Sequence, residues 1–418
     1  MKVFETYIMC FAHADIRRFA GGLAEYIHQE AVLAAERGVE TATVFPLHLR
    51  QFPRLKTWAS KGWGVCLGET WLGMYTWKGL ANLLGRWERK GRLLSEIQLH
   101  HIGGYRREDL RAFLEAVPAP TRLFLHDFNT VCPSVHLLRD GREFCGREDV
   151  GIRKCVGCRH WNAGWLPGMR ELLGGLGDRL SVVAPSVSAA DIWQRSYPEW
   201  RGKVDVVPHW LPSEKGHGTA RPPSRPFRLA FAGAPMFHKG WESYLEVVRT
   251  LRETGRDWEF LYFGVLEDVP DGIRAVRVIG DAEGGLVTAL RREAPDFLFL
   301  WAMCPETYSY VYYEALQAGV WVLTREGSGN IAAEAKKGVW GTVFPDMRAV
   351  LAFLEDGEGL KKTLALAAEK ERPVKMVPNP GIVESLGKGR ALGLPGGRGR
   401  RCWFREFLWK LKEWTGHA

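Results

Sequence analysis

Strand-like and helix-like segments alternate along most of this chain, and no other feature limits its fold as strongly. The first apolar run is KVFETYIMCF; a loop carrying Gly21 and Gly22 follows it, and a helical pattern comes next. The same order recurs in the second half, where helices are expected at 241–254, 310–318 and 330–337. Such a succession is typical of parallel α/β sheets covered by helices.

Length and one polar segment together predict two domains. The chain has 418 residues, more than a single domain usually holds. Residues 212–226, PSEKGHGTARPPSRP, are polar and proline-rich without a hydrophobic period, so we expect a linker there. We therefore predict an N-terminal Rossmann-like domain over residues 1–211, a C-terminal one over residues 227–375 and a basic tail over residues 376–418.

The segment CPETYSYVYYEALQAG carries the strongest signal for a chemical site. Glu306 lies in the loop after a buried strand, and Glu314 lies on the helix that follows. Ligands of open parallel α/β sheets bind at the carboxyl ends of the strands. A carboxylate there can accept hydrogen bonds from two neighbouring hydroxyl groups of a ribose or hexose. Ser309, between the two glutamates, is counted with the donor-binding residues.

Two further loops in the same half offer groups for binding an anion. The segment AFAGAPMFHKG places Gly233 after a strand and Lys239 with Gly240 ahead of a helix. A lysine there can neutralise a diphosphate as a point charge. The segment TREGSGN precedes the helix at Asn330, and its small residues let backbone N–H groups approach an anion.

Together these segments resemble glycosyltransferase family 4, whose members are retaining enzymes of the GT-B fold. The two glutamates match that family's E-x7-E motif, and FHKG matches its phosphate-binding lysine segment. FAGGLAEYIHQEAVLAAERGVE resembles its N-terminal glycine loop and helix, and LFLHDFNTVCP resembles its histidine segment. The resemblance covers roughly residues 1–350 and implies an α/β fold of two Rossmann-like domains that face each other across a cleft.

The resemblance also implies roles for the matching residues. Glu306 would bind hydroxyl groups of the donor sugar, and Glu314 would bind the ribose of the nucleotide. Lys239 would hold the diphosphate, with Gly233 and Gly240 shaping its loop. His126 would contact the sugar near its reacting carbon. Gly21 and Gly22 would let the backbone approach the donor phosphate and the acceptor.

One position departs from the family's pattern. The family has a basic residue five positions before the lysine, where this chain has Ala234, so one charge of the leaving diphosphate lacks its expected partner. His209 stands where many relatives have asparagine. Four other cations could take the missing role: Arg17, Arg18, Arg325 and Lys336.

The implied substrates are a UDP- or GDP-linked sugar donor and a lipid-linked or saccharide acceptor used in cell-surface glycan synthesis. Cations and helix N-termini would stabilise the charge that develops on the leaving nucleoside diphosphate. No Asp-x-Asp motif occurs in the sequence, so no catalytic metal is expected. A nucleotide-sugar epimerase of the same fold and a non-catalytic, zinc-containing binding protein are the alternative functions.

Four of the eight cysteines lie within 27 residues, in the spacing C-x12-C-x9-C-x2-C. The closing CVGC pair has a spacing that is common in zinc sites, and four close thiolates favour Zn²⁺. Structural zinc and four reduced thiols both fit the pattern, with His136 and His160 as alternative ligands. The local charge does not favour a nucleic-acid partner. The clustered cysteines are Cys132, Cys145, Cys155 and Cys158.

The net charge of +9 is concentrated at the C-terminal end, where eight Lys or Arg residues from position 388 onward stand against two Glu. On a helix, Trp403, Phe407, Leu411 and Trp414 would share one face. Such a helix can lie on an anionic membrane surface, or it can pack onto the first domain. The N-terminal residues carry no signal-peptide pattern, so we expect a cytoplasmic protein, peripheral at the inner face of the membrane if the tail binds lipid.

Overall fold

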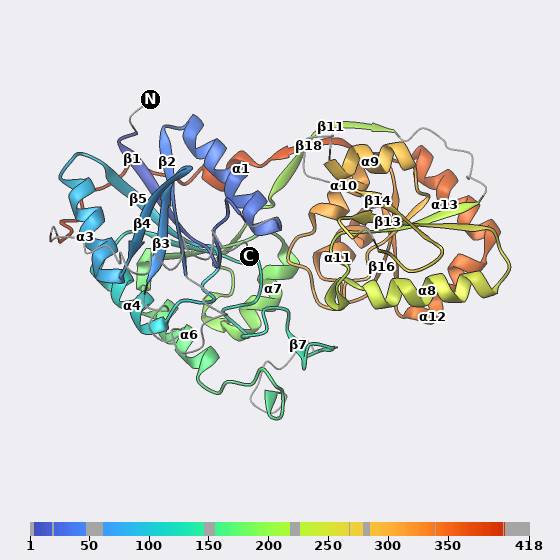
Figure 1. Cartoon of the computed structure of the whole chain (residues 1–418), viewed down its shortest axis with the longest axis horizontal. Helices are drawn as coiled ribbons and strands as arrows, with labels where there is room; N and C mark the ends of the chain where they lie inside the picture. Colours follow the sequence, from blue (N-terminus) through green and yellow to red (C-terminus); the bar gives the residue numbers. More distant parts are fainter. Residues whose placement is uncertain are drawn as a thin grey trace.

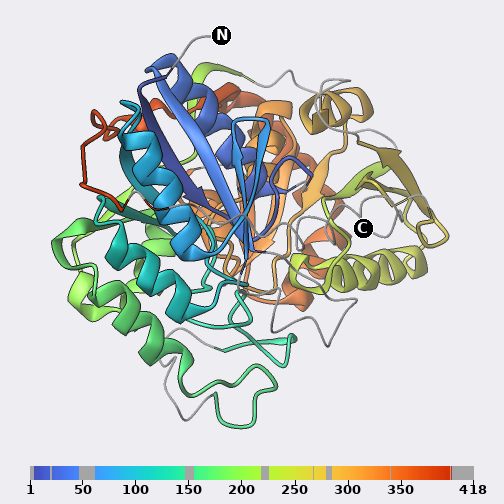
Figure 2. The same ribbon diagram turned by 60° about the vertical axis from the view of Figure 1, so that its left-hand side comes forward.

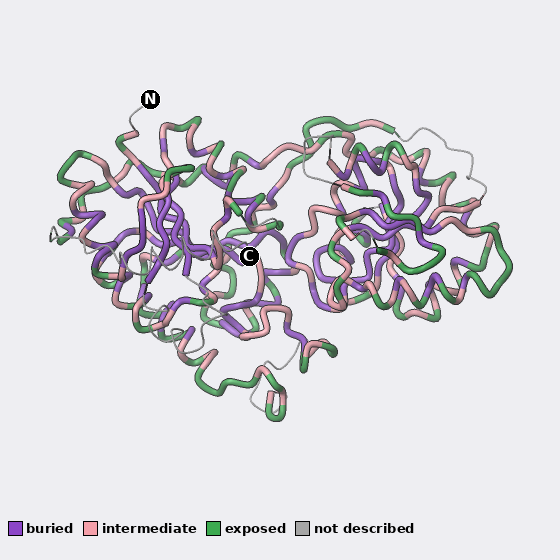
Figure 3. The backbone as a smooth tube through the Cα atoms, in the orientation of Figure 1, coloured by how far each residue is buried: buried purple, intermediate pink, exposed green. Residues whose placement is uncertain are grey.

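The two predicted α/β domains are present side by side in the computed structural model (Figure 1). Each is built on its own mostly parallel sheet with helices packed against it, and the predicted fold class is confirmed. The central strands are buried in both domains (Figure 3), because helices cover the sheets and the strands are apolar on both faces. The structure describes residues 4–18, 21–46, 62–145, 155–217, 226–266, 268–278, 285–338, 340–395 and 397.

The first domain contains an eight-stranded sheet in the order β10-β9-β6-β5-β1-β2-β3-β4. Its parallel strands are β1 (Thr6–Phe11), β2 (Val39–Pro46), β5 (Leu93–Leu99), β6 (Thr121–Phe124), β9 (Leu180–Ala184) and β10 (Val204–Val206). The Trp- and Gly-rich stretch after β2 adds two antiparallel edge strands, β3 (Trp63–Leu67) and β4 (Thr70–Tyr75). The helices are α1 (Gly22–Glu36), α3 (Trp77–Glu88), α4 (Arg107–Ala116), α6 (Trp165–Gly174) and α7 (Val187–Ser196).

The second domain contains six parallel strands in the order β14-β13-β12-β15-β16-β17. The strands are β12 (Phe227–Ala232), β13 (Trp258–Gly264), β14 (Ile273–Arg277), β15 (Phe297–Phe299), β16 (Trp321–Arg325) and β17 (Gly341–Phe344). The helices are α8 (Trp241–Glu253), α9 (Gly285–Glu293), α10 (Tyr310–Ala318), α11 (Asn330–Gly338), α12 (Met347–Glu355) and α13 (Gly357–Glu369). Gly319 ends α10 in the left-handed conformation, as expected of a glycine at that position.

A two-stranded ribbon runs between the domains, and its first strand takes up part of the segment that the sequence predicts as a linker. Residues 212–217 belong to β11 (Trp210–His217), which pairs antiparallel with β18 (Glu371–Pro378). Most residues of β11 are exposed, so this strand needs no alternation of apolar and polar residues, whereas most of β18 is half-buried. That is the physical reason why the sequence pattern did not indicate a strand.

After β18 the chain returns to the first domain and packs against it. Arg37 donates a hydrogen bond of 2.8 Å to the carbonyl oxygen of Val383 in the turn η6 (Pro380–Val383), and the Ser95 hydroxyl donates one of 2.7 Å to that of Gly387. Leu394 is buried in the first core. Figures 1 and 2 show this red segment beside α3. The part of the predicted tail beyond residue 397, which includes its amphipathic segment, lies outside the described residues. No described helix has the length and apolar character needed to cross a bilayer.

Candidate active site

Two predicted donor-binding residues form an ion pair at the carboxyl edge of the second sheet. Glu306 lies in the loop that follows β15, and Lys239 ends the short helix η4 (Phe237–Lys239) that follows β12. The Lys239 Nζ atom lies 2.8 Å from the Glu306 Oε1 atom. Burial acts to lower the pKa of Lys239, but the Glu306 carboxylate outweighs it and raises that pKa. The site therefore contains a firmly protonated lysine beside a carboxylate that is only 13% exposed.

Two glycines allow the backbone to approach closely enough to hold this pair. Gly240 has a φ of 88°, and a Cβ atom there would lie 2.2 Å from the carbonyl oxygen of Trp301. Gly329 has a φ of 63°, and its Cβ atom would lie 2.4 Å from the carbonyl oxygen of Glu306. The Asn330 N–H group donates to that same oxygen at 2.8 Å. The TREGSGN loop thus supports the backbone of Glu306.

The other two residues predicted in these loops have local structural positions. Ser309 is the N-cap of α10 and accepts a hydrogen bond of 3.3 Å from the Tyr312 N–H group. Gly233 follows β12 with a φ of 104°, and no atom stands within 4 Å of a Cβ built there. Glycine is needed at position 233 for the backbone conformation, which leaves open space after the strand.

Arg325, at the end of β16, is the candidate cation that shares surroundings with the ion pair. Burial, with Glu306 acting in the same direction and Lys239 and Arg325 against it, raises the pKa of the Cys304 thiol to about 12. All three charged groups therefore act on one thiol at the carboxyl edge of the sheet. Burial lowers the pKa of Arg325, whose guanidinium donates a long hydrogen bond of 3.4 Å to the carbonyl oxygen of Ala302.

The other three candidate cations lie elsewhere. Lys336 is exposed on α11 and pairs with Glu326 at 3.1 Å. Arg17 pairs with Asp15 at 2.7 Å. Arg17 and Arg18 both line an interdomain cavity rather than the surroundings of Cys304.

That cavity, about 580 Å³ in volume, brings together three more predicted residues. Gly21 and Gly22, at the start of α1, line it from the first domain. Glu314 and Tyr310, on α10, line it from the second. A Cβ atom on Gly22 would lie 3.4 Å from the Tyr310 ring, so the glycine lets the two helices approach. Its lining does not include Lys239 or Glu306, so the predicted residues form two neighbouring groups.

His126, in the loop after β6, is tied to the second domain beside Glu306. The Thr307 hydroxyl donates a hydrogen bond of 2.6 Å to the carbonyl oxygen of His126. The Ser186 hydroxyl donates one of 2.8 Å to the carbonyl oxygen of Thr307. Burial, and after it His100, holds the pKa of His126 well below its usual value. The ring is therefore neutral, and the carbonyl oxygen of the same residue contacts the loop that carries Glu306.

Two stacked histidines lie near Lys239, and the sequence motifs did not assign them to the donor site. His136 of the first domain stacks on His238 of the second, with ring centroids 4.2 Å apart. Burial first, and also the charge of Lys239, lowers the pKa of both, to about 4 for His238. The sequence offered one signal for this pair, because His238 is the direct neighbour of Lys239.

The four clustered cysteines gather around the hairpin of β7 (Leu138–Arg139) and β8 (Glu143–Phe144). Burial, and after it the other three thiols, raises the pKa of Cys145 to about 11. The Arg159 N–H group donates a hydrogen bond of 2.8 Å to Asp140, which ties the CVGC segment to the hairpin. All four cysteines are free thiols in the structure. Figure 1 shows β7 extending toward the second domain.

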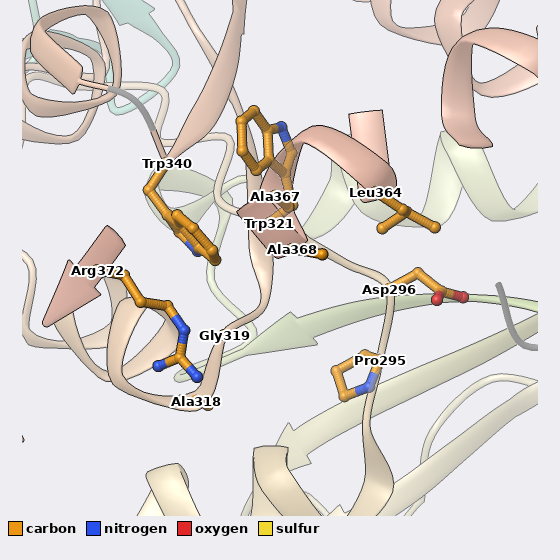
Figure 4. Close-up of a pocket in the computed structure, with 10 residues that line it drawn as sticks. All are labelled: Pro295, Asp296, Ala318, Gly319, Trp321, Trp340, Leu364, Ala367, Ala368 and Arg372. Atoms are coloured by element: carbon orange, nitrogen blue, oxygen red, sulfur yellow. The ribbon is translucent and has the colours of Figure 1, made fainter. Parts of the chain in front are cut away.

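A pocket at the opposite edge of the second sheet differs from this site. Figure 4 shows Pro295 and Asp296 at the amino end of β15, with Trp321 at that of β16. Its volume is about 40 Å³. The Arg372 guanidinium beside it donates to the carbonyl oxygens of Leu316 and Gln317, at 3.0 and 2.7 Å, and so caps α10. Because ligands of such sheets bind at the carboxyl edge, we assign this pocket no function.

Comparisons with known proteins add the fold to this geometry. No protein-family model and no curated protein sequence matches the chain. It is similar in structure to sucrose-phosphate synthase from Thermosynechococcus elongatus, with 12% identity, coverage of 87% of this chain and 95% of that chain, and a TM-score of 0.54. A glycosyltransferase from Rickettsia africae matches with 12% identity over 99% of both chains and a TM-score of 0.51.

The pneumococcal O-GlcNAc transferase GtfA, solved in complex with UDP and GlcNAc, matches with 9% identity, 87% and 95% coverage and a TM-score of 0.50. At these identities the similarity shows the fold alone. The chain has the GT-B fold, in which two Rossmann-like domains face each other across a cleft.

Proposed function

We propose that this protein is a retaining glycosyltransferase that moves a sugar from a nucleotide diphosphate donor to a lipid-linked or saccharide acceptor. The observation that carries the proposal is the ion pair of Lys239 and Glu306 at the carboxyl edge of the second sheet. A fixed cation beside a fixed carboxylate can bind the two unlike ends of a sugar diphosphate, the phosphate and the hydroxyl groups. The match of both residues to the family motifs and the GT-B fold support the same proposal.

In this proposal the ion pair separates when the donor binds. The Lys239 ammonium turns to the diphosphate, and the Glu306 carboxylate accepts hydrogen bonds from sugar hydroxyl groups. Arg325 supplies the second positive charge that Ala234 cannot supply. Both cations stabilise the negative charge that develops on the leaving diphosphate. Glu314, on the neighbouring cavity, binds the ribose.

The transfer itself needs no protein nucleophile. The bond between the anomeric carbon and the phosphate oxygen breaks, and the acceptor oxygen bonds to the same face of that carbon. The acceptor proton passes to the leaving phosphate, so charge and atoms balance. Neutral His126 contacts the sugar near this carbon, and the backbone at Gly21 and Gly22 admits the donor phosphate and the acceptor. The role of the protein is orientation and electrostatic stabilisation.

We further propose that the four clustered cysteines hold a structural zinc ion. Neighbouring thiols raise the pKa of Cys145 and of Cys155, and four thiolates suit the tetrahedral geometry that zinc takes in closed sites. Bound zinc would fix the loop that carries His136 against His238, beside Lys239. The cysteines thereby act on the donor site through the position of that loop.

The basic tail is proposed to bring the enzyme to an anionic membrane surface, where a lipid-linked acceptor would lie. The described chain supports a test of this idea, because the Gly397 carbonyl oxygen still accepts a hydrogen bond of 3.2 Å from Arg86. Truncation after Gly397 should therefore leave the described fold intact and abolish sedimentation with anionic vesicles. Full-length protein that ignores the vesicles would remove this support for a lipid-linked acceptor.

A panel of UDP-, GDP- and dTDP-linked sugars, supplied with and without a lipid-linked or saccharide acceptor, tests the proposed function. A transferase releases the nucleoside diphosphate from at least one donor, and the acceptor increases the rate. An epimerase would instead change the sugar nucleotide or release free sugar at a rate that the acceptor does not alter. Turnover of no donor, with the fold intact, would leave the protein a binding protein.

A further inference from the structure

A chain of buried polar side chains runs behind His126 in the first domain. The His126 Nε2 atom lies 3.0 Å from the His100 Nδ1 atom. The His100 Nε2 atom in turn lies 3.2 Å from the Gln98 Oε1 atom and 3.3 Å from a carboxylate oxygen of Glu30. Gln98, His100 and Glu30 are almost fully buried. Each polar atom in the chain must therefore find its partner within the protein.

The orientation of the Gln98 amide is determined by its neighbours. Its Nε2 group donates hydrogen bonds of 2.8 Å to Glu30 and 2.7 Å to Glu96. Glu96 also pairs with Arg122 at 2.8 Å, which keeps a carboxylate acceptor on that side. A reversed amide would place its oxygen against the Glu96 carboxylate. The Oε1 atom therefore faces the other way, where it accepts a hydrogen bond of 2.9 Å from the Cys10 thiol.

The fixed amide determines where each histidine carries its proton. Gln98 Oε1 can only accept, and the Glu30 oxygen 3.3 Å from His100 Nε2 makes no hydrogen bond, so the His100 Nε2 atom donates to Gln98 Oε1. Burial lowers the pKa of His100 to about 3, so its ring is neutral and its Nδ1 atom has no proton. That bare nitrogen can only accept, so the His126 Nε2 atom carries a proton and donates it. A neutral His126 then has a bare Nδ1 atom.

We propose that Gln98 and His100 are positioning residues that hold His126 in one tautomer, so that its Nδ1 atom accepts a hydrogen bond from a substrate hydroxyl group. His126 is partly exposed, and its Nε2 atom is already bonded to His100, so Nδ1 is the ring atom left for a ligand. The identity of this hydroxyl group as part of a sugar donor or acceptor rests on the proposed function.

The buried group of Cys10, Glu30 and His100 also has three ligand atoms close enough for a metal ion. The chain of hydrogen bonds that runs through Gln98 and His100 to His126, called the relay below, accounts for the same atoms without a metal. The Cys10 thiol and the Glu30 side chain are both hydrogen-bonded to Gln98. His100 connects them to His126. A hydrogen-bonded relay explains why these polar groups lie beneath a partly exposed histidine, which an isolated buried metal site would not explain.

The test is long-range ¹H–¹⁵N NMR of full-length protein labelled at histidine nitrogens, with the His126 signals assigned from their loss in His126→Gln. We expect the wild-type His126 proton on Nε2 and a bare Nδ1. In Gln98→Met, which removes the acceptor at similar size, both tautomers of His126 should appear. The control Gln317→Met removes a buried glutamine from α10, where its side-chain oxygen accepts from the Met376 N–H group, and should leave His126 unchanged.

A wild-type proton on Nδ1, or an unchanged tautomer in Gln98→Met, would overturn the relay. If Gln98→Met does not fold, His100→Gln provides the second variant, and the same tautomer change is expected. The measurement needs no donor, so it stands even if the protein turns over no sugar nucleotide. Where a donor is turned over, Gln98→Met should lower kcat by roughly tenfold at unchanged UDP affinity, as expected for one lost ligand hydrogen bond.

Discussion

The Thr307 hydroxyl group donates a hydrogen bond of 2.6 Å to the carbonyl oxygen of His126. This contact joins the loop after β15 to the loop after β6, and therefore one domain to the other. Glu306 is the preceding residue, so the carboxylate and the histidine adjoin the same interdomain contact. The carboxyl ends of the strands of both sheets thus meet where sugar transfer is proposed.

Arg325→Ala should weaken donor binding, because it removes the second cation at the carboxyl edge of the sheet. A hydrogen bond to a charged group contributes about 1.5–3 kcal/mol, so the Kd for UDP or GDP should rise roughly 10- to 160-fold in calorimetric titration. Lys336→Ala is the matched control, since that lysine is exposed and paired with Glu326. Equal affinities for wild type and Arg325→Ala would show that another group takes the role.

His136→Ala should loosen the loop that reaches the donor site. The variant removes a ring stacked at 4.2 Å on His238, a contact of about 0.5–1.5 kcal/mol. We expect the KM for the donor to rise roughly two- to tenfold with little change in thermal stability. His160→Ala, two residues after the CVGC pair, should keep the wild-type KM. A wild-type KM in His136→Ala would mean that this interdomain contact is only structural.

The sequence predicts which residues follow each strand, but it does not predict which loops contact one another. The sequence predicts helices at 310–318 and 330–337, close to the observed α10 and α11. Local features define them, namely apolar periodicity and Gly319. The ion pair of Lys239 and Glu306 forms because β12 and β15 are neighbours in the sheet, and no local sequence pattern predicts that these strands are neighbours. For the same reason, Arg325 stands out among the four candidate cations only through its place near Cys304 in the structure.

The relay behind His126 was also invisible in the sequence. Glu30 lies on a helix and Gln98 on a strand 68 residues later, and each is an ordinary polar residue by itself. Their burial becomes apparent only when α1 covers β5 and β1. Long-range pairing of this kind follows from the topology rather than from local propensity.

The purified protein should carry close to one zinc ion per chain, because four thiols of suitable spacing surround one hairpin. Metal analysis after dialysis against a weak chelator measures this. Cys155→Ser should lose the metal, whereas Cys66→Ser, in the buried strand β3, should retain it. A metal-free and equally stable wild type would mean that the four cysteines are reduced thiols.

Glu30 and His100 should give the stability a defined dependence on pH. Burial raises the pKa of Glu30 from 4.5 to about 8, so its contribution is present at low pH and is lost as the pH rises through 8. Burial lowers the pKa of His100 from 6.5 to about 3, so its contribution is present above pH 6.5 and is lost as the pH falls toward 3. The two slopes oppose each other between pH 4.5 and 6.5.

Between pH 6.5 and 8 only the Glu30 slope remains from this pair. The unfolding free energy from urea denaturation should therefore fall with rising pH in wild type and fall less steeply in Glu30→Gln. Glu36→Gln, at the exposed end of the same helix, should keep the wild-type slope. Identical slopes for wild type and Glu30→Gln would contradict a buried, protonated Glu30.

The most direct test of the proposed sugar transfer is the rate at which Glu306→Gln and Lys239→Ala release nucleoside diphosphate from the donor that wild type uses. Removing one stabiliser of transition-state charge costs about 2–4 kcal/mol, so each variant should lose roughly 30- to 1,000-fold in kcat. Both should stay folded, and Glu326→Gln, at the exposed pair with Lys336, should keep wild-type turnover. The account predicts those losses; turnover within about threefold of wild type in either variant would contradict it.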